Sequence, residues 1–144
     1  MKKILYDNQM FTFQRFGGVT RYFADLMYNL PANEFVSEIP MRYCENHYVT
    51  ETYGREYDRI SFPRNYRLRR LVYALTNRYL ASNAVKKGDY DIFHPTYFSP
   101  YFLKHVKKCQ KPFVLTIHDM TFERYPQDVL IYDRTIPHKK LLIS

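Results

Sequence analysis

Polar residues that could carry out chemistry follow directly after apolar segments of this sequence. An imidazole beside a carboxylate can orient a substrate by hydrogen bonding, and the carboxylate can either hold the imidazole tautomer or bind a substrate hydroxyl. Such residues form a site only if the fold brings them together. The candidates in these positions are His118 and Asp119, then His94 with Tyr97 close behind it, and the pair Asp7 and Asn8.

A glycine pair near the N-terminus indicates a second kind of site, one for an anion. Gly17 and Gly18 precede a segment in which apolar residues recur at helical spacing from Val19 up to Pro31. The start of a helix presents unpaired backbone N–H groups and the positive end of the helix dipole, and both favour an anion. Arg21 falls in the first turn, where a cation opposes the dipole. Its position is better explained if an anion binds nearby.

Five apolar segments rich in β-forming residues predict the strands that would position these groups. Helical patterns separate the segments, and this alternation is typical of a parallel sheet with helices on both faces. Right-handed crossovers make the fold a Rossmann-like α/β fold with the strand order 3-2-1-4-5. In such sheets the carboxyl ends of the strands share one edge, where ligands bind, so the candidate residues are expected to converge there. The predicted strands are Lys3–Tyr6, Glu34–Met41, Arg59–Phe62, Asp89–His94 and Phe113–Ile117, the last expected to be buried on both faces.

The longest predicted helix covers Tyr66–Lys87 and ends at Gly88. Another is expected from Ser99 to about Lys108, with Ser99 as its N-cap. Residues 9–18, 46–59 and 121–134 are expected to be irregular. The long helix should bury an apolar stripe and turn most of its arginines to the other side. The stripe is Leu68, Leu71, Val72, Leu75, Tyr79 and Val85, and the arginines are Arg64, Arg67, Arg70 and Arg78.

The composition favours one globular domain and leaves its partner open. The chain has 144 residues, 46% of them hydrophobic, and a formal net charge of +8. That charge would suit nucleic acid, an anionic membrane surface or a phosphorylated substrate. Cys44 and Cys109 lie far apart with no metal-ligand spacing, so neither a zinc site nor a disulfide framework is predicted, and a reduced cytoplasmic setting is the simplest interpretation. The N-terminus lacks the apolar region of a signal peptide, and no apolar run is long enough to span a bilayer.

Each candidate also has a purely structural interpretation. A histidine after a strand can be a structural hydrogen-bonding group, and Asp119 can cap the turn that follows it. Gly17 and Gly18 can form a tight turn without any ligand. The dinucleotide fingerprint G-x-G-x-x-G is absent, which argues against an NAD site.

Three segments together resemble the N-terminal half of the family 4 glycosyltransferases, which are retaining enzymes of the GT-B fold. They are MKKILYDNQMFTFQRFGGVTRYFADL, DIFHPTYFSPYF and KPFVLTIHDMTFERYP, and they span nearly the whole chain. The most specific parts are the G-G-x-x-R loop that starts a helix, the H-P-T-Y after the fourth predicted strand, and the H-D after the fifth.

The resemblance implies two facing Rossmann-like domains with the active site in the cleft between them. Residues 1–144 would be a single N-terminal domain on the acceptor side, truncated at its C-terminal end, and the donor-binding domain would be absent from this chain. The chain alone would then not transfer sugar. The expected activity is transfer of a sugar from a nucleotide-sugar to a saccharide or glycolipid acceptor in cell-surface polysaccharide biosynthesis, in the cytoplasm or peripherally at the inner face of the membrane, with no metal and no cofactor beyond the donor.

The resemblance also implies roles for the candidate residues. Gly17 and Gly18 match the family's loop beside the donor diphosphate, and Arg21 would lie near it. His118 matches the family's histidine in the catalytic cleft, with Asp119 beside it. The acceptor side of the cleft would be lined by Asp7, Asn8, His94 and Tyr97.

An alternative function belongs to a different class of protein. The chain could be a basic binding module that docks on an anionic membrane or on nucleic acid through the arginines at 64–70. For the glycosyltransferase, contact with an anionic membrane through Arg64, Arg67 and Arg70 is also compatible, and no nucleic-acid partner is expected.

Overall fold

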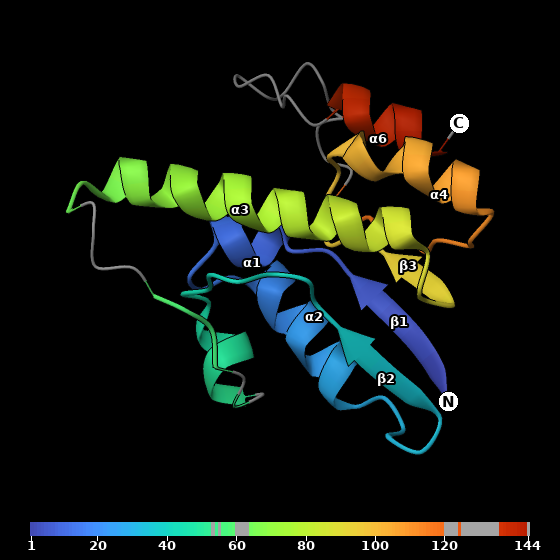
Figure 1. The fold of residues 1–144 in the computed structure, drawn as a ribbon, viewed down its shortest axis with the longest axis horizontal. Helices are drawn as coiled ribbons and strands as arrows, with labels where there is room; N and C mark the ends of the chain where they lie inside the picture. The colour runs from blue at the N-terminus through green and yellow to red at the C-terminus, as the bar shows by residue number, and fades with distance from the viewer. Residues whose placement is uncertain (53, 55, 60–63, 120–123, 125–135, 144) are drawn as a thin grey trace.

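A computed structural model describes residues 1–52, 54, 56–59, 64–119, 124 and 136–143. The described residues form a mixed α/β fold around a small parallel sheet (Figure 1). Its strands are β1 (Lys2–Tyr6), β2 (Phe35–Glu38) and β3 (Ile92–His94), in the order β2-β1-β3. Both pairings are parallel, and the β1–β3 register places Tyr6 opposite His94. The predicted neighbours of the first strand, and its central place among these three, are therefore confirmed.

Helices follow the strands as the sequence pattern predicts. The longest helix has the predicted bounds. It begins after Asn65, whose side chain accepts hydrogen bonds from the next turn, and it ends at Gly88, which has a φ of +71°. The helices are α1 (Gln9–Phe13), α2 (Gly18–Tyr28), the π-helical turn η1 (Tyr48–Thr52), α3 (Tyr66–Lys87), the 3-10 turn η2 (Pro100–Phe102), α4 (Leu103–Cys109) and α6 (Ile136–Ile143). Two of them, α1 and η1, lie in segments that the sequence predicted to be irregular.

Two apolar cores lie on opposite faces of the sheet because successive side chains of a strand point to opposite sides. Ile4 and Tyr6 pack with α2 in one core, whereas Leu5, between them, packs in the other core with Phe93. The second core is completed by side chains of α3, η2, α4 and α6. Helices thus cover both faces of the sheet, as expected for this class of fold.

The described residues show three strands rather than the predicted five. Within the part of the chain that the structure describes, Phe113–Ile117 pairs with the sheet through a single bridge between Phe113 and Phe93, with two backbone hydrogen bonds of 3.0 and 2.9 Å. Val114 is exposed, so this segment is not buried on both faces; it lies at the edge of the sheet beyond β3. The predicted strand Arg59–Phe62 falls, apart from Arg59, outside the described residues.

The predicted apolar stripe of α3 is also wrong, except at Val85. The side chains that α3 buries are Tyr73, Asn77, Ala81 and Val85. Leu68, Leu71, Val72, Leu75 and Tyr79 all face solvent. The helix is held against the protein by one tyrosine, small residues and a polar group rather than by its leucines.

Asn77 explains why α3 can be anchored through a polar residue. Its amide oxygen accepts hydrogen bonds from the backbone N–H groups of Arg42 and Tyr43, at 3.0 and 3.1 Å. Its amide nitrogen donates to the carbonyl of Tyr43 and the hydroxyl of Thr12. Asn8 donates to the Asn77 backbone carbonyl at 2.7 Å. All the hydrogen-bonding capacity of this buried side chain is used, as the cost of an unpaired buried group requires.

Candidate functional site

His94 and His118 lie together against α2 at the carboxyl edge of the sheet. The His118 ring makes edge contacts with Tyr22 and Phe23 of α2, with ring centroids 5.0 and 5.7 Å apart. The His94 ring contacts Phe23 at 5.1 Å and Tyr6 at 5.3 Å. Two histidines separated by more than twenty residues therefore contact the same aromatic ring, that of Phe23. Because α2 begins at Gly18, Tyr22 and Phe23 place the two histidines beside its second turn.

The two histidines differ in burial and in hydrogen bonding. His94 is buried, and its Nε2 is 2.9 Å from the hydroxyl oxygen of Thr116. Burial, with a smaller contribution from His118, lowers the pKa of His94 to about 4. His118 is exposed, and partial desolvation lowers its pKa as well. Both rings are therefore neutral at pH 7, and the exposed His118 is the one that a ligand can reach.

The glycine pair forms the start of α2, as predicted. Gly17 is the N-cap, and its carbonyl accepts hydrogen bonds from the Thr20 hydroxyl at 2.9 Å and the Arg21 N–H at 3.0 Å. A Cβ at position 17 would lie 2.1 Å from Oε1 of Gln14, so a larger residue there would require Gln14 to move. Arg21 is exposed, and its Nε lies 3.5 Å from Asp25 one turn later. This surface ion pair offers a second explanation for the position of Arg21.

Asp7 lies beneath the same edge and is fully buried. Its Oδ1 accepts hydrogen bonds from the Thr96 N–H at 2.8 Å and the Thr96 hydroxyl at 2.6 Å. Further hydrogen bonds come from the N–H and the amide of Gln9 and from the hydroxyl of Tyr101. Burial raises the pKa of Asp7, while these hydrogen bonds act in the opposite direction. Asp7 thus ties the end of β1 to the segment after β3 and exposes no oxygen to a ligand.

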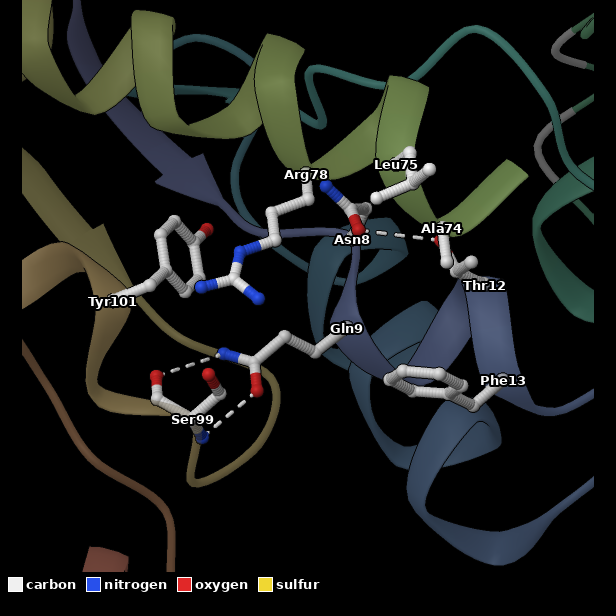
Figure 2. Close-up of a pocket in the computed structure, with 9 residues that line it drawn as sticks. All are labelled: Asn8, Gln9, Thr12, Phe13, Ala74, Leu75, Arg78, Ser99 and Tyr101. Carbon is white, nitrogen blue, oxygen red and sulfur yellow. Dashed lines mark hydrogen bonds between the residues drawn. The ribbon is translucent and has the colours of Figure 1, made fainter. Parts of the chain in front are cut away.

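A small pocket lined by residues of α1 and α3 opens next to Asn8 and Gln9, which follow Asp7 in the chain (Figure 2). Its volume is about 160 Å³, similar to the roughly 150 Å³ cavity that holds one benzene molecule. Gln9 spans its floor and is hydrogen-bonded to both backbone groups of Ser99, at 2.9 and 3.4 Å. The Arg78 guanidinium points toward the ring of Tyr101 in Figure 2, with 5.8 Å between the guanidinium carbon and the ring centroid. The other lining residues are Asn8, Thr12, Phe13, Ala74 and Leu75.

The remaining predicted site residues lie near the same edge. Asn8 is buried in the pocket wall and is hydrogen-bonded to α3, as described above. Tyr97 is half-buried, and its ring contacts Phe98. Asp119 is exposed, and its backbone carbonyl accepts a hydrogen bond of 3.0 Å from Lys139 of α6.

Sequence reasoning missed the residues that hold this edge together. Gln9 and Thr96 supply most of the hydrogen bonds to Asp7, and Arg78 and Tyr101 form one wall of the pocket. A signal for the first two was present, because Gln9 directly follows Asp7 and Asn8, and Thr96 directly follows His94 and Pro95. No comparable signal marked Tyr101, which belongs to the turn η2.

The low pKa of His94 predicts a loss of stability in mild acid. The unfolded chain takes up a proton near pH 6.5, whereas folded His94 takes it up only near pH 4. The stability that His94 contributes is therefore complete above pH 6.5 and is lost as the pH falls to 4, by about 3 kcal/mol. Asp7 has the opposite sign, since its raised pKa adds stability as the pH falls.

Urea unfolding of the wild type and of His94→Gln at pH 7, 6, 5 and 4 separates the two contributions. The wild type should lose more unfolding free energy than the variant over this range, by about 3 kcal/mol. Equal pH dependence in both proteins would show that His94 is not the group that resists protonation.

The chain is thus an α/β protein with a parallel sheet, and a cluster of polar and aromatic side chains lies at the carboxyl ends of its strands. Comparison with known protein families, with curated protein sequences and with solved structures gives no match. Among the described residues, no helix has both the length and the hydrophobicity needed to cross a bilayer.

Proposed function

We propose that this chain is the acceptor-side domain of a retaining glycosyltransferase that uses a nucleotide-sugar donor. The observation that carries the proposal is the position of His118 against α2, at the edge where β1 and β3 also end. An exposed neutral imidazole there contacts the second turn of a helix whose start can receive an anion. The motifs that resemble family 4 glycosyltransferases supply the reaction class.

Departure of the nucleoside diphosphate is the step that these groups would assist. The bond from the anomeric carbon to the phosphate oxygen breaks, the acceptor hydroxyl oxygen bonds to that carbon on the same face, and the negative charge gathers on the phosphate, which takes up the hydroxyl proton. Backbone N–H groups at the start of α2, near Gly17 and Gly18, would stabilise this charge because they are fixed before the reaction. His118 would donate a hydrogen bond to the transferred sugar or to the departing phosphate. Arg21 would join them by leaving its surface pair with Asp25.

The acceptor would be held in the pocket between α1 and α3, with Asp7 between it and the groups proposed to bind the donor phosphate. The pocket between α1 and α3 is large enough for one six-membered ring. Asn8 and Arg78 could hydrogen-bond the ring's hydroxyl groups, and Tyr101 could support its face. Asp7, whose oxygens already accept hydrogen bonds from the protein, acts as a positioning residue for the segment that carries Tyr97. A second domain would supply most of the residues that bind the nucleotide-sugar donor.

The complete protein, including any sequence beyond Ser144, tests this proposal. It should release nucleoside diphosphate from at least one member of a panel of uridine, guanosine and thymidine diphosphate sugars in the presence of saccharide or glycolipid acceptors. NMR of the product should show the anomeric configuration of the donor. Inversion at that carbon would contradict the retaining class, and no release from any donor would contradict the proposal as a whole.

A further inference from the structure

The outward face of α3 carries apolar side chains where a helix of this fold would usually be polar. Leu71 and Leu75 are 53% and 61% exposed, and Tyr79 is 67% exposed. Together with Leu68 and Val72 they form what we call the leucine face. It lies opposite the side of α3 that packs on the protein, which is Tyr73, Asn77, Ala81 and Val85.

The leucine face belongs to the part of α3 that is farther from α4. Ser82 of α3 approaches His105 of α4 at 3.4 Å, which places α4 beside the C-terminal part of α3. Figure 1 shows the N-terminal half of α3 continuing past α4. Phe13, which is 56% exposed, lines the same pocket as Leu75 and extends the apolar surface onto α1.

The charged residues of α3 itself are all basic. The sequence of α3 contains arginines and lysines but no aspartate or glutamate. Arg64 and Arg67 are exposed at its start, and Arg78 is exposed one turn beyond Ala74. Arg69 and Arg70 lie near the ring of Tyr66, and Arg70 also donates to the Phe13 carbonyl at 3.0 Å. Arg69 also lies 3.7 Å from the Glu45 carboxylate, so the positive charge available beside the leucine face comes mainly from Arg64, Arg67, Arg70 and Arg78.

Leucines and tyrosines exposed along one face of a basic helix match the chemistry of an anionic lipid bilayer, which has an apolar interior and negatively charged headgroups. Leucine side chains can enter the acyl boundary, tyrosines suit the headgroup level, and arginines pair with anionic headgroups. Nucleic acid would explain the arginines but not the leucines. We propose that the leucine face of α3 docks this protein on an anionic lipid bilayer. The inference does not depend on the proposed enzymatic function.

Docking in this way would set the orientation of the candidate site. Leu75 and Arg78 belong to α3 and also line the pocket that contains Asn8 and Gln9. The pocket would therefore open beside the bilayer, where a lipid-linked molecule could reach it.

A single tryptophan provides the test, because the chain contains none. Leu75→Trp reports from the leucine face, and Tyr28→Trp is the matched control, since Tyr28 is exposed at the end of α2 on the other side of the sheet. Phosphatidylcholine vesicles with roughly one third phosphatidylglycerol are the probe. We expect a blue shift of the Leu75→Trp emission with these vesicles, no shift with pure phosphatidylcholine, and no shift of Tyr28→Trp with either. Equal shifts of both tryptophans, or no shift of either at low salt, would overturn the proposal.

Co-sedimentation with the same vesicles separates α3 from general attraction by net charge. Leu71→Ser/Leu75→Ser and Arg64→Gln/Arg67→Gln should each weaken binding by roughly tenfold. Lys107→Gln/Lys108→Gln on α4 removes the same charge and should change binding less than twofold or so. Circular dichroism checks that the exposed substitutions leave the fold intact. Equal losses from the two charge variants, unchanged binding in the leucine variant, or binding to RNA with none to vesicles would each overturn the proposal.

Discussion

Asp7→Ala is expected to destabilise the folded chain by about 3 to 5 kcal/mol. The substitution leaves the buried N–H groups of Thr96 and Gln9 without an acceptor, and each such group costs about 1 to 3 kcal/mol. The carboxylate also joins the end of β1 to the segment after β3, so its loss loosens the edge where the candidate residues meet. Urea unfolding followed by circular dichroism measures the change.

Two further variants test whether the loss of stability comes from the buried hydrogen bonds to Asp7. Asp7→Asn keeps one acceptor and the size of the side chain, so it should cost less than Asp7→Ala. Asp25→Ala removes an exposed aspartate whose surface pair with Arg21 is worth at most about 1 kcal/mol. If Asp7→Ala costs no more than Asp25→Ala, the buried hydrogen bonds to Asp7 do not hold this edge together.

The sequence predicted the elements whose signals are local. The bounds of α3 followed from its apolar content and from Gly88, and the start of α2 followed from Gly17 and Gly18. The parallel order of β2, β1 and β3 followed from the alternation of strands and helices. The inferences on the helices succeed because capping and glycine conformation depend on a few neighbouring residues. The inference on strand order succeeds because parallel strands joined by a helix cross over with one preferred hand.

The failures come from contacts between distant segments. Apolar spacing alone assigned the leucines of α3 to the core, but the core side is fixed by Asn77, whose partners lie in α1 and at residues 42 and 43. The segment Phe113–Ile117 has strand-forming residues, yet its pairing stops after one bridge to Phe93. The candidate residues were expected to share one edge of the sheet and they lie near it, but the burial of Asp7 beneath Thr96 could not be predicted from its position after a strand.

His118→Ala tests the role of the exposed histidine, which is the central claim of this account. The side chain is exposed, and of its two ring contacts one is with the partly exposed Tyr22 and the other with the edge of the buried Phe23, so the variant should still fold. Removing one hydrogen-bond donor that acts on developing charge typically lowers turnover by about 10²- to 10³-fold. His105→Ala is the matched control, because His105 lies on α4 beside Ser82 and away from the carboxyl edge.

The decisive measurement is kcat/KM of the complete protein for the nucleotide-sugar that the wild type uses best. The account predicts that His118→Ala lowers kcat/KM by about 100-fold or more, while His105→Ala stays within about twofold of the wild type. A folded His118→Ala variant with near-normal kcat/KM would contradict the assignment of the catalytic cleft to this edge of the sheet.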